Sequence, residues 1–68
     1  MSQSILPTCK LIFEAYETMV ALYVLLISET NPQKRKQYRA SIANIRSRLD
    51  VLNDVLEDVI ENAKQHHG

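Results

Sequence analysis

Apolar residues in the second half of the chain recur with the spacing of a coiled-coil helix. They alternate steps of four and three residues in an unbroken series, formed by Tyr38, Ile42, Ile45, Leu49, Leu52, Leu56, Val59 and Ala63. Such a heptad seam is typical of a helix that packs along another helix. Asn31 and Pro32 precede it, a favoured helix cap followed by the residue preferred at the first helical position. We therefore expect a helix over about 32–65.

The first half of the chain predicts a more apolar helix over about 8–29. Pro7 is tolerated only within a first turn, and Ser4 or Thr8 can serve as the cap. We expect one seam at Ile12, Tyr16, Met19, Tyr23 and Leu26, a second stripe at Phe13, Val20, Val24 and Ile27, and a third at Leu11, Ala15, Leu22 and Leu25. Because few residues remain to join the two helices, they should fold back on each other. The prediction is an all-α fold, an antiparallel two-helix hairpin that forms a single domain over 1–68.

Two helices cannot cover all the apolar surface of this sequence. Residues 19–27 are apolar on every side of the first helix, and such a helix is covered on all sides in a folded protein. The second helix is longer, so the part after about Asn53 extends beyond the first helix, although its apolar face is broad there. We therefore expect a protein partner or self-association. The residues expected at that interface are Tyr16, Met19, Tyr23, Leu26, Val55, Val59 and Ile60.

Composition narrows the class of protein and its compartment. The chain has 68 residues, with eight basic and eight acidic side chains and a formal net charge of zero. A chain this short buries only about 60% of its unfolded surface, and one cysteine cannot form an internal disulfide, which excludes a multidomain enzyme and a disulfide scaffold. The free Cys9 and the lack of a basic, cleavable N-terminal segment predict a cytoplasmic protein. The longest apolar run, 19–27, is shorter than the roughly 20 residues that span a bilayer, so we expect no membrane contact.

Charges are separated along the second helix. Residues 30–49 hold Lys and Arg but no acid, and residues 50–61 hold Asp and Glu but no base, an order that opposes the helix dipole. Two arrangements would compensate. The basic half can face the C-terminal end of the first helix with Glu29, or it can lie along the acidic half of a second copy in an antiparallel dimer. Arg35, Arg39 and Arg46 share one side and could follow phosphates, but the neutral charge and the lack of interleaved aromatic residues argue against nucleic acid.

No residue pattern points to catalysis, a cofactor or a metal. His66 and His67 have no third ligand nearby, and Cys9 is interpreted as a small hydrophobic residue. Carboxylates one helical turn apart lack the Glu-x-x-His motif of di-metal helix bundles; they are Glu14 with Glu17 and Asp54 with Asp58. We expect no enzyme activity, no cofactor and no small-molecule substrate.

The layout resembles a known family. A first helix, a turn and a longer helix that opens with Lys36-Gln37-Tyr38 and continues through a Leu/Ile seam are similar to the small E-type co-chaperones of type III secretion needle subunits, over about Leu11 to Ala63. The resemblance implies a cytoplasmic hairpin that packs against a second, tetratricopeptide-like chaperone and keeps the needle subunit from polymerising early. It places Met19, Tyr23 and Leu26 at the contact with that chaperone. The alternative function is a homodimeric four-helix-bundle regulator that touches nucleic acid through its arginines.

Overall fold

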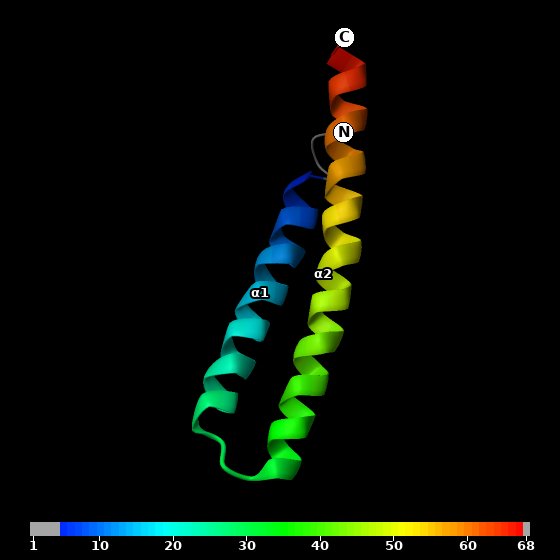
Figure 1. Ribbon diagram of the computed structural model, residues 1–68. Coiled ribbons are helices and arrows are strands. Elements are labelled where there is room, and N and C mark those ends of the chain that lie inside the picture. Colours follow the sequence, from blue (N-terminus) through cyan, green and yellow to red (C-terminus); the bar gives the residue numbers. More distant parts are fainter. Residues whose placement is uncertain (1–4, 68) are drawn as a thin grey trace.

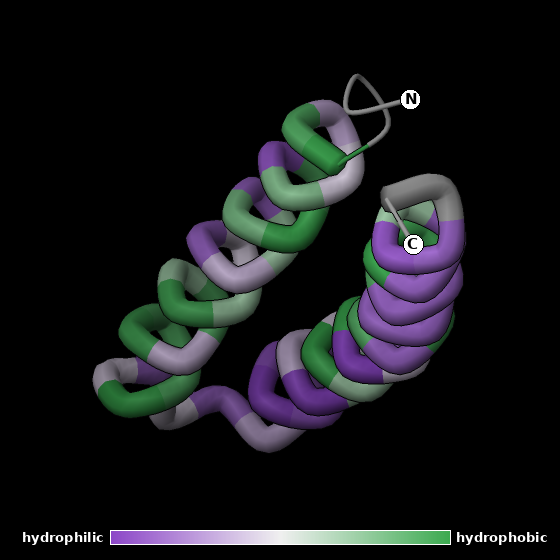
Figure 2. Tube along the Cα trace, turned by 90° about the horizontal axis from the view of Figure 1, so that it is seen from above, coloured by the Kyte–Doolittle hydropathy of each residue, from purple (hydrophilic) through white to green (hydrophobic). Residues whose placement is uncertain are grey.

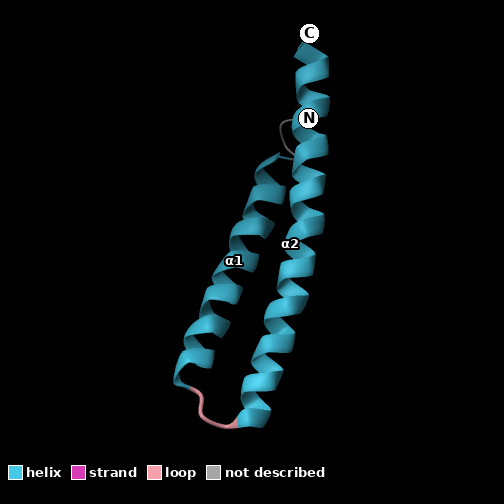
Figure 3. Ribbon diagram, in the orientation of Figure 1, coloured by secondary structure: helices cyan, strands magenta, loops and turns pink. Residues whose placement is uncertain are grey.

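Two helices make up the structure, a computed structural model that describes residues 5–67 and the side chains of 5–65. Helix α1 (Ile5–Ser28) and helix α2 (Pro32–His67) run antiparallel and are joined by residues 29–31 (Figures 1 and 3). The expected all-α hairpin is thereby confirmed. Helix α1 begins at Ile5 rather than at about residue 8, which keeps Pro7 in the first turn. The possible cap Ser4 and the side chains of His66 and His67 lie outside the described residues.

Asn31 starts α2 in the manner expected of a helix cap. Its Oδ1 atom accepts hydrogen bonds from the backbone N–H groups of Gln33, at 2.8 Å, and Lys34, at 3.3 Å. These are two of the N–H groups at a helix start that have no partner within the helix. The prediction from Asn31 and Pro32 is confirmed.

Arg35 closes the C-terminal end of α1 from the neighbouring helix. Its Nη1 atom donates to the carbonyl oxygen of Leu26, at 2.8 Å, and to that of Glu29, at 2.9 Å. Helix α1 has no basic residue in its own last turn, so Arg35 supplies the positive charge that stabilises the negative end of a helix. Of the two arrangements expected to compensate for the basic half of α2, the contact with the C-terminal end of α1 is therefore present at Arg35.

The two helices meet along a narrow core. Leu49 is the most buried residue on α2, at 4% exposed, and Ala15, Ile45 and Leu49 form a cluster against which Ile12, Met19 and Leu22 pack. On α1 the residues that face α2 are buried or half-buried and alternate steps of three and four; this inner seam comprises Ile5, Thr8, Ile12, Ala15, Met19, Leu22 and Leu26.

The inner seam differs at two positions from the first seam predicted for this helix. Ala15 and Leu22, and not Tyr16 and Tyr23, lie with Ile12, Met19 and Leu26 against α2, and both tyrosines stay exposed. Small residues such as Ala15 and Thr8 let two helix backbones approach closely, whereas a tyrosine there would force them apart.

The hairpin is a rod with an unusually large surface. Its extents are 55 × 15 × 12 Å and its radius of gyration is 16.0 Å, against about 11 Å for a compact domain of this length. Its accessible surface of 5468 Å² exceeds the roughly 4,400 Å² typical of a folded monomer of this mass. Most of α1 is coloured hydrophobic and much of α2 hydrophilic in Figure 2. The large apolar side chains that stay exposed are therefore concentrated on α1.

Candidate helix-binding surface

A second heptad series runs along α1 and is left uncovered. Each member follows a member of the inner seam by one residue, and the steps again alternate three and four. This outer seam comprises Leu6, Cys9, Phe13, Tyr16, Val20, Tyr23 and Ile27. All seven are exposed, and the six members other than Cys9 range from Tyr23 at 41% to Ile27 at 83%.

The outer seam points in a different direction from the core. An offset of one residue turns a stripe by about 100° around a helix, so a neighbour on the outer seam would lie beside α2 and not in its place. Phe13, Tyr16 and Val20 line a shallow hollow on this side of α1. A heptad stripe matches the side-chain spacing of another helix. Two such stripes on one helix are typical of a bundle in which that helix has two neighbours.

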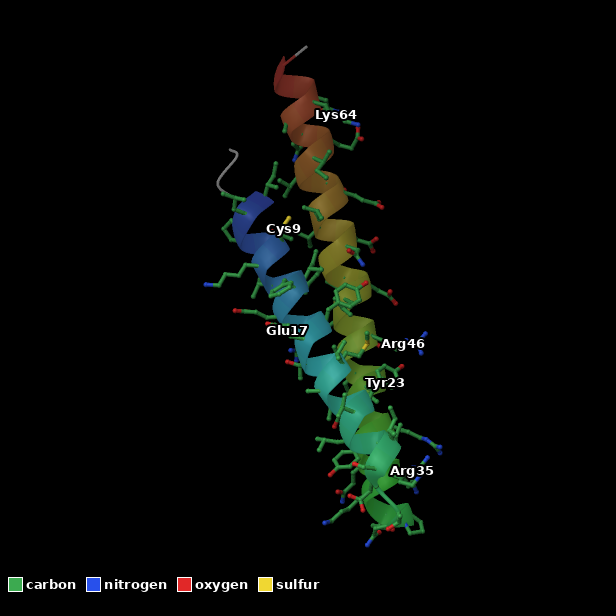
Figure 4. The ribbon with its side chains drawn as sticks, turned by 90° about the vertical axis from the view of Figure 1, so that its left-hand side faces the viewer. Cys9, Glu17, Tyr23, Arg35, Arg46 and Lys64 are labelled. Atoms are coloured by element: carbon green, nitrogen blue, oxygen red, sulfur yellow. The ribbon has the colours of Figure 1, made fainter. Side chains whose placement is uncertain are left out.

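A charged border on α2 lies along one edge of the outer seam. Tyr23 and Leu26 line a shallow groove with Arg39, Ala43 and Arg46 of α2, and Figure 4 shows Tyr23 and Arg46 on the same side of the hairpin. The exposed residues of α2 that follow its core positions by one residue continue this border. We call them the charged rim; they are Arg39, Ala43, Arg46, Asp50, Asn53 and Glu57.

Among the residues that the structure describes, no charge of the rim forms an ion pair. Over the described residues the single ion pair joins Lys64 Nζ to Glu61 Oε1, at 3.7 Å, on the far end of α2. Arg39 and Arg46 lie toward the turn, whereas Asp50 and Glu57 lie toward the open end, so opposite charges adjoin on the rim only where Arg46 and Asp50 stand about one helical turn apart. The rim thus presents a basic half and an acidic half to solvent.

The opposite side of the hairpin is less regular. A shallow groove there is lined by Leu11, Glu14 and Thr18 of α1 and by Arg48 and Leu52 of α2. Val51 and Val55 are exposed. Polar side chains interrupt this side, and no unbroken heptad series runs along it.

The seven residues expected at a partner interface fall into three environments. Tyr16 and Tyr23 belong to the outer seam, whereas Met19 and Leu26 are half-buried in the inner seam against α2. On α2, Val55 is exposed, Val59 is half-buried and Ile60 continues the rim toward the open end.

Five residues of the outer seam were absent from that expected interface, Phe13, Val20 and Ile27 among them. Phe13, Val20 and Ile27 are exposed in line with the two tyrosines. The sequence held a signal that could have found them. Phe13, Val20 and Ile27 each follow a residue of the predicted seam by one position, so they form one heptad series with the two tyrosines.

No group of three metal-ligating side chains occurs among the described residues. In the same part of the chain, no buried side-chain nitrogen or oxygen lacks a hydrogen-bond partner.

Helix α1 is long and apolar enough to cross a membrane. The expectation of no membrane contact came from the nine-residue apolar run, whereas this criterion takes an 18-residue window of the helix, and the expectation stays a prediction. Length and composition do not separate a membrane span from a signal sequence or from a helix that is covered in a soluble assembly. The heptad spacing of the outer seam favours a helical neighbour.

Comparison with known proteins finds no family model, no curated protein and no solved structure that matches this chain.

Proposed function

We propose that this protein is a non-enzymatic helical interaction module, which binds a helix of another chain along the outer seam. The observation that carries the proposal is the second heptad series on α1, which is complete from Leu6 to Ile27 and exposed throughout. Burial of apolar area, worth about 25 cal/mol per Å², is then the driving force for binding.

The size of the uncovered surface supports this proposal. The chain exposes about 1,000 Å² more than a folded monomer of its mass. A stable protein interface buries about 800 Å² on each partner, so one helical neighbour would bring the surface into the ordinary range. Tyr16 and Tyr23 are residues of the type that anchors interfaces.

The resemblance to type III secretion co-chaperones gives the finer form of the proposal. In that form the partner is a second chaperone, and the pair keeps a secretion needle subunit unpolymerised in the cytoplasm. The hairpin would add α1 to the helices of the chaperone. Tyr16 and Tyr23 would then contact it directly, while Met19 and Leu26 would hold α1 in place from behind.

Co-expression with the proteins encoded beside it tests the proposal. If the partner is a different protein, as in the finer form, we expect a heteromer of fixed stoichiometry that survives gel filtration and is lost in Val20→Asp. Val51→Asp is the matched control, because Val20 is 57% exposed and Val51 is 61% exposed on another side of the hairpin. A complex that tolerates Val20→Asp as well as Val51→Asp would contradict binding along the outer seam.

The second candidate function is a homodimeric four-helix bundle that acts as a regulator. The separated charges of the rim favour it, since a second copy would bring opposite charges together. Binding of nucleic acid through Arg39 and Arg46 would appear as salt-sensitive retention on an immobilised duplex. The absence of retention at low salt would remove the nucleic-acid form of this candidate.

A further inference from the structure

We infer that the outer seam takes up a second copy of this chain, in antiparallel orientation, with Arg39 opposite Glu57 and Arg46 opposite Asp50 of that copy. The inference rests on the proposed function, because it names the helix that the outer seam binds. It follows from the order of charges on the rim, from the charges of Lys10 and Glu17 at the far edge of the outer seam, and from the unequal lengths of the helices.

The rim changes sign symmetrically about residue 48. Arg46 and Asp50 are equally far from this position, as are Arg39 and Glu57, and the uncharged Ala43 and Asn53 form the pair between them. An antiparallel copy centred there puts every arginine opposite an acid, four times in the dimer. A parallel copy in the same register would put like charges opposite each other.

The far edge of the outer seam follows the same symmetry. Ala15 packs in one cluster with Ile45 and Leu49, so the level of residue 48 on α2 falls close to residues 13 and 14 on α1. Lys10 and Glu17 border the seam on the side away from α2 and lie at equal distances from that level. Both are exposed, so the dimer would place Lys10 of each copy near Glu17 of the other.

The same arrangement covers the exposed end of α2. Helix α2 has 36 residues and α1 has 24, and Figure 1 shows α2 extending past the start of α1. An antiparallel copy centred on residue 48 brings its own turn beside that extension. Ile27, at the turn of one copy, then lies near Ile60 of the other, and both are exposed in the single chain.

A dimer with both turns at one end lacks these advantages. It would place the two basic halves at the same end and both extensions of α2 at the other. The exposed Ile60 would then have only its own counterpart nearby, and Ile27 would face the partner's basic half. Charge and shape therefore select the arrangement with the turns at opposite ends.

Charge exchange on the rim tests the inference in the full chain. One variant carries Arg39→Glu and Arg46→Glu, a second carries Asp50→Arg and Glu57→Arg, and a third carries all four changes. Sedimentation equilibrium over a range of concentrations gives the dimer dissociation constant, and circular dichroism confirms that each variant stays helical.

We expect a wild-type dimer of twice the 7.8 kDa chain mass. Each double variant should dissociate at a concentration about tenfold higher or more, because four exposed pairs become repulsive. An equimolar mixture of the two double variants should form a heterodimer, and the fourfold variant should regain the wild-type constant. High salt should reduce all these differences.

The outcomes separate this inference from the proposed function. If the dimer dissociation constant is unchanged in the charge variants but the dimer is lost in Val20→Asp, the inference is overturned and the proposed function is left standing. A wild-type monomer that forms a Val20-dependent heteromer has the same consequence. A helical monomer that binds neutral phosphatidylcholine vesicles, and binds no helical partner, overturns both.

Discussion

The inner and outer seams of α1 have the same length and the same heptad spacing, yet one is a core and the other is open. The inner seam contains the small residues Thr8 and Ala15, so α2 can approach it closely. The outer seam carries Phe13, Tyr16 and Tyr23, which need a wider space between helices. Spacing thus predicts that a stripe binds a helix, while side-chain volume decides which stripe the chain's own second helix occupies.

Removing a side chain from the core should have the largest effect on folding. Leu49→Ala should lower the free energy of unfolding by about 2–5 kcal/mol, because a buried leucine leaves a cavity. Thermal melting followed by circular dichroism at a fixed chain concentration measures this. Val51→Ala, two residues away and exposed, is the control and should change little. Equal effects in the two variants would contradict the position of the core.

Enlarging the smallest core residue should have the next largest effect. Ala15→Phe should cost about 1–3 kcal/mol, because the larger side chain forces the helices apart within the core that Ala15 forms with Ile45 and Leu49. Ala21→Phe adds the same side chain at an exposed position of α1 and serves as the control. If urea unfolding found Ala15→Phe as stable as the wild type, the distinction between the seams by side-chain volume would be wrong.

The contact of Arg35 with the end of α1 should contribute less. Arg35→Ala should cost about 1–2 kcal/mol, because the carbonyl oxygens of Leu26 and Glu29 lose a charged donor that is partly buried. Lys36→Ala removes an exposed charge next to it and should be nearly neutral. Amide hydrogen exchange in the last turn of α1 should accelerate in the first variant alone. Unchanged exchange in Arg35→Ala would show that the cap contributes nothing.

Loss of the helix cap should have the smallest effect of the series. Asn31→Ala should cost about 1 kcal/mol, since two backbone N–H groups lose their acceptor, while Asn31→Asp should keep most of the stability. Both can be compared by urea unfolding. A stability order with the alanine variant at or above the aspartate variant would contradict the role of Oδ1.

Local signals predicted much of this fold. The cap at Asn31, the position of Pro32 and the seam of α2 each depend on residues close in sequence, and all appear in the structure. The sequence predicted three apolar stripes on α1 but not which residues form the inner seam, because that helix is apolar over too wide an arc for periodicity to choose between Ala15 and Tyr16. That choice depends on the distance to α2, which only packing sets.

The arginines in the basic half of α2 lie on two different sides of the hairpin, although they are close in the sequence. Arg46 lies beside Tyr23 on the rim, whereas Arg48 lines the groove on the other side of the hairpin with Leu11. Two residues along a helix turn a side chain by about 200°, so neighbours in a charge run can serve different surfaces. A charge reversal at Arg46 should therefore affect assembly more than one at Arg48.

The reactivity of Cys9 tests the central claim most directly, because this only cysteine of the chain lies in the outer seam and is exposed. We predict that the rate of its reaction with a small neutral thiol reagent falls as the chain concentration rises, and that Val20→Asp restores the fast rate. A thiol that reacts at the same fast rate at every concentration, in a chain that stays helical and soluble, would contradict the claim that another copy covers the outer seam.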